Sequence, residues 1–389
     1  MGFVASRRDR VRRYLAVLLL GVCGAATQPA RADDAIPLAS AGANSLTYGP
    51  LSTATGDNSL AAGYTSTASG QNSVALGNQS SASADNAMAY GVQTVAAGAN
   101  SIAIGNLSKA AGNGATTVGI LSVAGASNAS AFGNLSKAIG NNATAVGVLS
   151  AATGDDAVAY GNQSTAAGRI ASAFGSLSQA TGESATAIGG TSVASGYGSS
   201  AIGGGSVASG NNSLAGGLNA QAGGYAAVAV GSSARATQSG TVAVGQQAAA
   251  TEADAIAVGR GASANAANSV AIGANSVASA PNTVSIGSPG NERRLTNVAP
   301  GVSDSDGATY GQVRRASEGV AMAMAMGGNA LADNKRFSVG INYGYFDHLN
   351  ALAFASQLRI NSNVVVSGAL GYGLEMKQVG GRVGVQLAW

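Results

Sequence analysis

A short phrase recurs along this chain at a fixed 14-residue interval. The hexapeptide Asn72-Ser-Val-Ala-Leu-Gly77 returns as Asn100-Ser-Ile-Ala-Ile-Gly105 and Asn268-Ser-Val-Ala-Ile-Gly273, with looser copies between. Its closing glycine keeps this interval from Gly49 to Gly287, which gives 18 copies without an insertion. A fixed period of this kind is the signature of a stacked architecture, in which each copy packs against its neighbours.

Each copy predicts two short strands separated by glycine-marked turns. In Ser73-Val-Ala-Leu-Gly77 the alternation places Val74 and Leu76 on one face and Ala75 on the other. We expect the large apolar side chains of successive copies to fill a narrow parallel β-roll, roughly 85 Å long with strands ~4.8 Å apart. The second strand, as in Ser108-Lys-Ala110, offers only small residues to the interior. A disordered Gly/Ser/Ala tract is the alternative, but disorder does not need apolar pairs at a fixed phase.

The start of the chain, residues 1–32, predicts a signal peptide. Residues 7–13 contain five arginines, residues 14–26 are apolar, and Ala30-Arg31-Ala32 supplies a small-x-small cleavage site before Asp33. The apolar run is too short to cross a membrane as a helix. A lipoprotein box ending at Cys23 and a twin-arginine signal fit these residues less well than an ordinary Sec signal.

Loss of the signal peptide changes the charge of the chain. The full sequence has 20 Lys and Arg against 17 Asp and Glu, whereas 14 basic and 16 acidic residues remain after residue 32. The repeat region, residues 33–287, has 5 basic and 9 acidic residues. This balance argues against a basic nucleic-acid-binding surface, so we expect no nucleic-acid partner. The only cysteine, Cys23, leaves with the signal, so the mature chain has no disulfide or thiol chemistry.

The composition changes where the repeat ends. Glu292-Arg-Arg-Leu-Thr-Asn-Val-Ala299 is followed by Ser303-Asp-Ser-Asp-Gly-Ala308 and Gln312, a charged and non-repetitive segment. This segment resembles the neck of the YadA-like trimeric autotransporter adhesins, in which an ERxxTNVAxG…D(A)…Q pattern joins head to stalk. Gly307 and Tyr310-Gly311 depart from the usual Asp-Ala-Val-Asn wording of that neck. The phrase NSVAIG also resembles the head repeat of the same family.

A short helix is predicted from Gln312 to Ala330. Alanine and methionine favour a helix over the strand that the alternating methionines from Met322 to Met326 would also fit. Small residues along one seam allow close approach of neighbouring helices. The positions at heptad spacing a and d are Val313, Ala316, Val320, Ala323, Gly327 and Ala330.

The end of the chain, residues 335–389, predicts four strands, each apolar on one face and small or polar on the other, as an outer-membrane barrel requires. Four strands cannot close a barrel, and an open edge in lipid leaves backbone groups unpaired. Three chains would supply 12 strands, whereas a soluble four-stranded sheet would expose an apolar face. The apolar positions are Phe337, Val339, Ile341, Tyr343, Tyr345, Leu352, Phe354, Leu358, Ile360, Val364, Val366, Leu370, Tyr372, Leu374, Val383, Val385, Leu387 and Trp389.

Residues suited to chemistry are sparse. His348 is the single histidine and falls in a predicted turn, and Asp155-Asp156 is a turn pair that is repeated nowhere. No His, Cys or carboxylate cluster has metal-binding spacing. Gly196-Tyr-Gly198 is a by-product of the repeat rather than a nucleotide-binding loop. We expect no enzyme, no catalytic or metal site and no cofactor.

The pattern as a whole predicts a mainly β protein. We divide it into a signal peptide (1–32), a β-roll head (33–288), a neck (289–311), a short coiled-coil or pore helix (312–332) and a membrane anchor (333–389). The anchor is the four-stranded share of a 12-stranded trimeric outer-membrane barrel. In the trimer we expect the small alanine-rich faces of the rolls to pack between chains.

The family resemblance implies a homotrimeric adhesin of a Gram-negative bacterium, anchored in the outer membrane with its head on the cell surface. It further implies that the chain exports its own head through the barrel, with help from the barrel-assembly machinery that reads a terminal aromatic such as Trp389. The implied ligand belongs to the host matrix, a host cell or another cell. A structural surface, autoaggregation or biofilm protein without a specific host ligand is the alternative. An ice-binding solenoid would need one exposed residue type in every rung, which the variation among Lys109, Lys137 and Gln179 contradicts.

Overall fold

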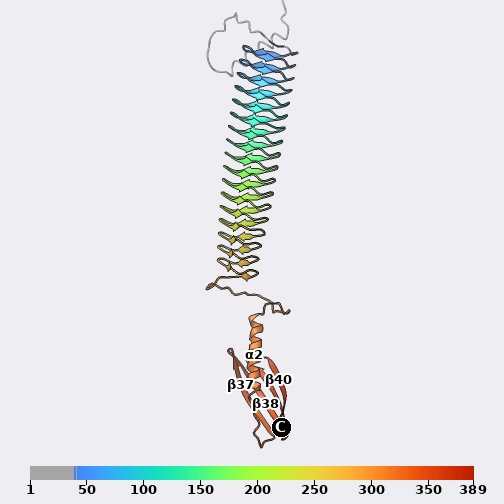
Figure 1. The fold of residues 1–389 in the computed structure, drawn as a ribbon, viewed down its shortest axis with the longest axis vertical. Coiled ribbons are helices and arrows are strands. Elements are labelled where there is room, and N and C mark those ends of the chain that lie inside the picture. Colours follow the sequence, from blue (N-terminus) through green and yellow to red (C-terminus); the bar gives the residue numbers. More distant parts are fainter. Residues whose placement is uncertain (1–38, 41) are drawn as a thin grey trace, which may run out of the picture. The chain divides into compact units, whose positions relative to one another are not determined.

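The structure of the protein is a computed structural model that describes residues 39–40 and 42–389 (Figure 1). The predicted signal peptide, residues 1–32, lies outside the described residues. The chain divides into two compact units, the first ending at Arg293 and the second running from Arg294 to Trp389. The first unit holds the repeats, and the second holds one helix and four long strands.

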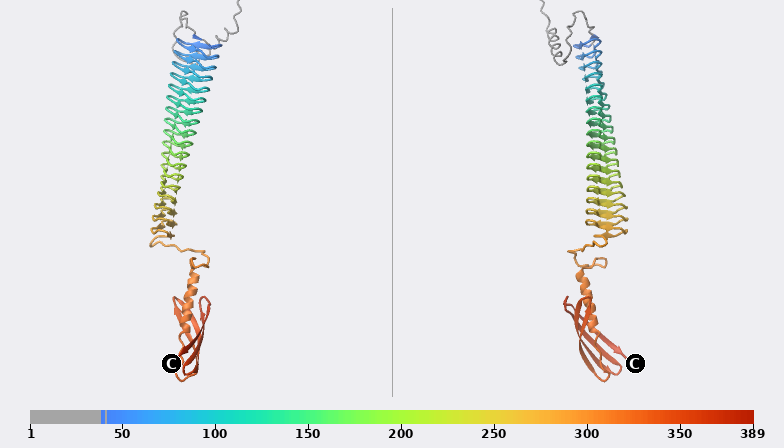
Figure 2. Two further views of the ribbon diagram at one scale, coloured as in Figure 1. Left: turned by 45° about the vertical axis from the view of Figure 1, so that its right-hand side comes forward. Right: turned by 90° about the vertical axis from the view of Figure 1, so that its left-hand side faces the viewer.

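Each 14-residue copy forms one rung of a parallel β-roll, with one strand in each of two sheets (Figures 1 and 2). Within a sheet every strand pairs in parallel with the strands of the rungs before and after it. Thr116, for example, pairs with Ile102 on one side and with Ser130 on the other. Because every pairing joins equivalent positions of successive copies, the period in the sequence is the period of the stack, and the prediction of a parallel β-roll is confirmed.

Sheet A contains the first strand of each rung and sheet B contains the second. Sheet A comprises β1 (Ala39–Ser40), β3 (Thr53–Ala54), β5 (Thr67–Ala68), β7 (Ser81–Ala82), β9 (Val95–Ala96), β11 (Lys109–Ala110), β13 (Val123–Ala124), β15 (Lys137–Ala138), β17 (Ala151–Ala152), β19 (Thr165–Ala166), β21 (Gln179–Ala180), β23 (Val193–Ala194), β25 (Val207–Ala208), β27 (Gln221–Ala222), β29 (Arg235–Ala236), β31 (Ala249–Ala250), β33 (Ser263–Ala264) and β35 (Val277–Ala278). Sheet B comprises β2 (Leu46–Tyr48), β4 (Leu60–Ala62), β6 (Val74–Leu76), β8 (Met88–Tyr90), β10 (Ile102–Ile104), β12 (Thr116–Val118), β14 (Ser130–Phe132), β16 (Thr144–Val146), β18 (Val158–Tyr160), β20 (Ser172–Phe174), β22 (Thr186–Ile188), β24 (Ser200–Ile202), β26 (Leu214–Gly216), β28 (Val228–Val230), β30 (Val242–Val244), β32 (Ile256–Val258), β34 (Val270–Ile272) and β36 (Val284–Ser285).

The closing glycines turn the chain from sheet B to sheet A. From Gly49 to Gly273 they have φ between 107° and 144°, a conformation that residues with a Cβ rarely adopt. A Cβ on Gly175 would also lie 2.6 Å from the carbonyl oxygen of Gly189 in the next rung. The Gly175 carbonyl accepts a hydrogen bond of 2.9 Å from the buried Ser178 hydroxyl. The positive φ and the short distance to the next rung together explain why this position is always glycine.

The opposite corner, which leads from sheet A to sheet B, carries a ladder of asparagine side chains. The Asn58 amide donates to Asn72 and the Asn72 amide donates to Asn86, each at 3.2 Å. These asparagines have φ near 56°, which asparagine tolerates better than most residues. The recurrent asparagine of the NSVAIG phrase therefore closes a turn and links successive rungs.

The interior of the roll is filled by alanine and serine. Ala75 is fully buried, whereas Val74 and Leu76 are half-buried on the outer face of sheet B. The expectation that the large apolar residues fill the roll was therefore wrong, because two strands of two or three residues closed by tight turns leave room for little more than Cβ and hydroxyl atoms. The prediction for the other strand is confirmed: Ala110 points inward and Lys109 is exposed.

The second unit is a helix against an antiparallel sheet. The helix is α2 (Tyr310–Met326), and the strands β37 (Phe337–Phe346), β38 (Leu349–Asn361), β39 (Val364–Gly373) and β40 (Val379–Leu387) pair in chain order. The helix contacts all four strands and lies along one face of the sheet (Figure 2). The prediction of four long C-terminal strands is confirmed.

Both ends of the helix are set by local residues. Thr309 is the N-cap and forms a capping box with Gln312, which also exchanges two hydrogen bonds of 2.9 Å with the backbone of Gly301. Gly327 is the C-cap. The helix predicted from Gln312 to Ala330 thus starts two residues earlier and ends four residues earlier, because Gly327 and Gly328 interrupt it.

The two faces of the four-stranded sheet differ as the alternation predicts. Large apolar side chains are exposed on the face away from the helix, among them Ile341, Leu370 and Val383. The face toward the helix presents small residues such as Ala351 and Ala353. Among the described residues, no helix combines the length and apolar character needed to cross a membrane.

Candidate functional site: the outer face of sheet B and the anchor

The outer face of sheet B carries two parallel columns of side chains along the head. The first residue of each strand forms what we call the leading column, and the third residue forms the trailing column. The trailing column is largely apolar and exposed, with Tyr160 57% and Ile188 41% accessible. The leading column consists of Leu46, Leu60, Val74, Met88, Ile102, Thr116, Ser130, Thr144, Val158, Ser172, Thr186, Ser200, Leu214, Val228, Val242, Ile256, Val270 and Val284. The trailing column consists of Tyr48, Ala62, Leu76, Tyr90, Ile104, Val118, Phe132, Val146, Tyr160, Phe174, Ile188, Ile202, Gly216, Val230, Val244, Val258 and Ile272.

This face is too apolar to be an ordinary solvent-facing surface. Contiguous exposed apolar patches beyond a few hundred Å² mark interaction sites in soluble proteins. The leading column runs through all 18 strands of sheet B and the trailing column through the first 17, whereas the alanines that we expected between chains lie inside each roll. The apolar columns are therefore the candidate surface for packing between chains, which corrects that expectation.

In the anchor, the small residues of the sheet let the helix approach closely. A Cβ on Gly344 of β37 would fall 2.8 Å from the Ala325 backbone nitrogen and closer still to the Ala321 carbonyl oxygen. A Cβ on Gly371 of β39 would fall 3.2 Å from the Met322 side chain. The glycines on this face therefore hold the helix against the sheet.

A buried carboxylate fixes the helix to one turn of the sheet. Glu318 of α2 is fully buried and accepts hydrogen bonds from the backbone N–H groups of Glu375 at 3.0 Å, Met376 at 2.6 Å and Gln378 at 3.3 Å. These three residues belong to the turn between β39 and β40. A side chain on Gly373 would collide with the Glu318 carboxylate. The sequence analysis missed Glu318, since nothing in a helical pattern distinguishes it from a solvated glutamate.

The same end of the anchor carries a second carboxylate contact. Glu375 accepts hydrogen bonds from the backbone N–H of Asn350 at 2.9 Å and from the Asn350 side-chain amide at 2.5 Å. The backbone hydrogen bond, then the side-chain one, hold the pKa of Glu375 below its usual value. His348, in the β37–β38 turn as predicted, lies 3.1 Å from the Tyr345 hydroxyl through Nδ1. The Glu375–Asn350 contact thus joins the β39–β40 turn to the start of β38, next to the β37–β38 turn.

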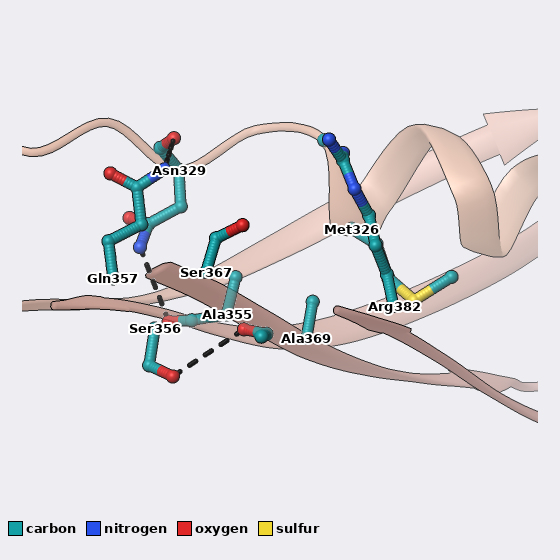
Figure 3. Close-up of a pocket in the computed structure, with 10 residues that line it drawn as sticks. Met326, Asn329, Ala355, Ser356, Gln357, Ser367, Ala369 and Arg382 are labelled. Atoms are coloured by element: carbon teal, nitrogen blue, oxygen red, sulfur yellow. Dashed lines mark hydrogen bonds between the residues drawn. The ribbon is translucent and has the colours of Figure 1, made fainter. Parts of the chain in front are cut away.

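At the other end of the sheet, a polar pocket of about 210 Å³ opens on the helix side (Figure 3). Asn329 donates to the Ser338 hydroxyl at 3.1 Å, and its own carbonyl accepts from Gln357 at 3.1 Å. Arg382 of β40 reaches toward this pocket beside the last turn of the helix (Figure 3). The pocket is lined by Met326, Gly327, Asn329, Ala355, Ser356, Gln357, Ser367, Gly368, Ala369 and Arg382.

The predicted neck begins with a contact to the base of the roll. The Arg293 guanidinium donates to the Ser276 hydroxyl at 2.9 Å and to the carbonyls of Ile286 at 2.8 Å and Ala274 at 2.5 Å. Further along, Asp306 accepts from the backbone N–H groups of Ser303 and Val302, each at 2.9 Å. These two hydrogen bonds, that of Ser303 being the larger cause, hold the pKa of Asp306 below its usual value.

The acidic pair that the sequence analysis singled out belongs to the ladder at the asparagine corner. Asp155 accepts from the Asn141 backbone N–H at 2.7 Å, and Asp156 accepts from the Asn142 amide at 3.0 Å. Within the described residues, no three His, Cys, Asp or Glu side chains are grouped so as to hold a metal ion.

Comparisons with known proteins match the repeat region and the C-terminal strands separately. The YadA head domain repeat (2 copies) matches 13 segments, many of them overlapping, between residues 49 and 288, and the YadA-like membrane anchor domain matches residues 329–389. A solved structure, the collagen-binding domain of Yersinia adhesin YadA, is 21% identical over 64% of this chain and 83% of that chain, with a TM-score of 0.22. The comparison with curated proteins gives no match.

The head repeat alone matches more than half of the residues, and the anchor match covers all four long strands. The chain therefore belongs to the family of YadA-like trimeric autotransporter adhesins, with an anchor in the outer membrane and a head exposed at the cell surface.

Proposed function

We propose that this adhesin exports its own head through a 12-stranded barrel formed by three chains and attaches the bacterium to host matrix, to host cells or to other cells. The observation that carries the proposal is the four-stranded sheet with two open edges. Strands β37 and β40 each pair on one side only within the described chain. The proposed role is non-catalytic.

The open edges require further strands. An unpaired backbone group in lipid costs several kcal/mol, so a sheet whose outer face is apolar must close on itself or on other copies. The smallest bacterial barrels have about eight strands, which one chain does not supply. Three chains give 12 strands, and the trimer that the family implies satisfies both edges of every sheet.

The surface of the helix supports three chains as well. The predicted seam positions Val313, Ala316, Val320 and Ala323 are exposed in the single chain, whereas Ala321, on the opposite side, is buried against the sheet. The seam positions are therefore free to meet two other helices inside the barrel. Gly327 and Ala330 lie beyond the helix, so the seam is shorter than the six positions predicted.

In the head, the apolar columns of sheet B support side-by-side packing of three rolls. Burial of this face leaves sheet A and its corners exposed in each roll. Three identical heads on one anchor give multivalent attachment, which raises avidity without new contacts. For assembly, we propose that the barrel-assembly machinery recognises the C-terminal strand β40 and the aromatic Trp389.

Truncation of the anchor tests the export step. Removal of residues 335–389 should leave the head in the periplasm and abolish attachment. The matched control removes residues 218–231, one whole rung, and should keep a shorter head on the surface because each rung contacts only its neighbours. Surface display without the anchor would contradict the proposal.

A second candidate role, self-association of heads, is favoured by the distribution of charge. The acidic side chains of the roll gather at the asparagine corner, whereas three of the basic ones project from sheet A. Oppositely charged surfaces on separate parts of one head suit contact between heads of different trimers. Binding of the purified trimer to matrix proteins and to itself, over a range of salt concentrations, separates the two roles. The acidic group is Asp57, Asp85, Asp155, Asp156, Glu183, Glu252 and Asp254, and the basic group is Lys109, Lys137 and Arg235.

A further inference from the structure

A third column lies beside the apolar face of the head. It is formed by the residue three positions after each trailing-column residue, at the turn from sheet B to sheet A, and we call it the corner column. Every member has φ between 50° and 65°. The corner column consists of Leu51, Thr65, Gln79, Gln93, Leu107, Leu121, Leu135, Leu149, Gln163, Leu177, Thr191, Gly205, Asn219, Ser233, Gln247, Gly261 and Asn275.

Leucine is an unexpected residue at this corner. A left-handed backbone suits glycine and asparagine, which the same corner uses in rungs nearer the anchor, and it disfavours leucine. The leucines are also poorly covered by their own chain, since Leu121 is 42% and Leu149 is 46% exposed. A strained and exposed apolar residue that recurs over successive rungs requires a partner outside the roll.

In the middle of the head, the corner residue tends to be large and apolar where the leading-column residue of the same rung is small. In four rungs the leading column carries threonine or serine and the corner carries leucine: Thr116 with Leu121, Ser130 with Leu135, Thr144 with Leu149 and Ser172 with Leu177. One rung within this run exchanges the apolar residue between the columns, since its leading residue is the apolar Val158 and its corner residue is the polar Gln163.

The rungs around this run fit the relation to different degrees. Rungs on both sides of the run resemble the rung of Val158 and Gln163, as in Val74 with Gln79 and Val242 with Gln247. Both residues are large in the rungs of Ile102 and Leu46, and both are small in the rungs of Thr186 and Ser200. The exchange therefore concerns the middle third of the head.

The two columns do not meet within one chain. In one rung, Thr144 and Leu149 lie at opposite ends of the sheet B face, with Val146 between them on the same face. Three residues of strand alone span about 10 Å, so neither side chain reaches the other. Leucines that accompany small residues which they do not touch in their own chain point to contact between chains.

We propose that, in the middle third of the head, the corner leucines of one chain pack into the space above the small leading-column residues of the neighbouring chain in the same rung. The proposal rests on the trimer of the proposed function and specifies its interface. In a three-fold assembly whose chains face a common axis through sheet B, one end of each face meets the opposite end of the next. The corner column is continuous with the apolar face already assigned to this interface, so the occupant is a second copy of this chain.

Paired cysteines in the full-length protein test the contact. Cys23 is the only cysteine in the sequence and lies in the predicted signal peptide, so introduced thiols have no competitor in the mature chain. Thr144→Cys combined with Leu149→Cys should, after oxidation on intact cells, give a covalent trimer that survives boiling without reductant. The matched control, Lys137→Cys with Leu149→Cys, places the first thiol on the outer face of sheet A and should give monomers.

A third pair tests the register. Val158→Cys with Leu149→Cys joins the corner to the leading column one rung further along, and the proposal predicts little covalent trimer from it. Trimer from this pair alone would overturn the proposal. Monomers from Thr144→Cys with Leu149→Cys, while unboiled samples still run as trimers, would overturn the proposal and leave the proposed function intact. If the unsubstituted protein gives no trimer in unboiled samples, both the proposal and the proposed function are overturned.

An exchange of residues tests the same contact without a crosslink. Thr144→Val and Leu149→Gln should each lower the temperature at which unboiled trimers dissociate, whereas the double variant, which reproduces the rung of Val158 and Gln163, should recover most of the loss. Additive losses would mean that the two columns do not touch and would overturn the proposal.

Discussion

Substitution of one closing glycine should destabilise the head far more than substitution of a glycine on its outer face. In Gly175→Ala the backbone has φ of 133°, which costs a residue with a Cβ about 1–3 kcal/mol. The new Cβ would also lie 2.6 Å from the Gly189 carbonyl oxygen, so the two rungs must move apart. That movement weakens the 2.8 Å hydrogen bonds from Gly175 to Tyr160 and from Gly189 to Phe174, each worth about 1 kcal/mol. The sum of these terms is about 3–5 kcal/mol.

Gly216→Ala is the matched control. Gly216 stands in the trailing column, where Ala62 occupies the equivalent position of another rung, and a Cβ there would meet only Val230, at an ordinary 3.7 Å. We expect a change within about 1 kcal/mol of the unsubstituted protein. Urea unfolding of the purified full-length protein, followed by far-ultraviolet circular dichroism, measures both variants. Equal midpoints for Gly175→Ala and Gly216→Ala would refute the argument that stacking distance fixes the closing glycines.

Three further predictions concern the anchor. Glu318→Ala should destabilise the trimer by about 2–4 kcal/mol, because three backbone N–H groups lose their carboxylate acceptor, and the dissociation temperature of unboiled trimers measures the loss. Gly344→Val should displace the helix from β37, since even a Cβ there meets the Ala321 carbonyl; increased protease cleavage of the anchor in outer-membrane preparations would report it. The pKa of Glu375 is lowered in the folded protein, so its contact with Asn350 contributes stability above the unfolded pKa of 4.5 and loses it only as the pH falls through the lower folded value. A carboxyl-carbon NMR titration should show Glu375 still ionised when the pH reaches 4.5, and the stabilising contribution should be absent in Glu375→Gln.

The rungs of the head were predictable from the sequence because one period sets one repeat. The 14-residue interval implies that equivalent residues stack, and the closing glycine implies a turn that excludes Cβ atoms. The inward face was not predictable from alternation alone, because alternation is symmetrical about the strand. The residues held a signal that could have decided it: the position of Ala75 is small in every rung, whereas the flanking positions of Val74 and Leu76 vary in size. The narrow space between stacked rungs admits only small side chains.

The anchor shows a different limit. Its strands were predictable because lipid on one side and a small-residue face on the other impose a strict period of two. The burial of Glu318 was not, because it depends on backbone N–H groups that lie 57 to 60 residues further along the chain. The helix was predicted to end at Ala330, four residues too late, because heptad spacing continues past Gly327, where the helix ends.

The number of chains in the assembled protein tests the central claim most directly. The full-length protein, extracted from outer membranes in mild detergent, can be weighed by light scattering with the detergent contribution subtracted, or by native mass spectrometry. A particle of three chains is predicted, since only then do the four-stranded sheets close and the apolar faces of the heads meet. A stable particle containing one chain would contradict the account.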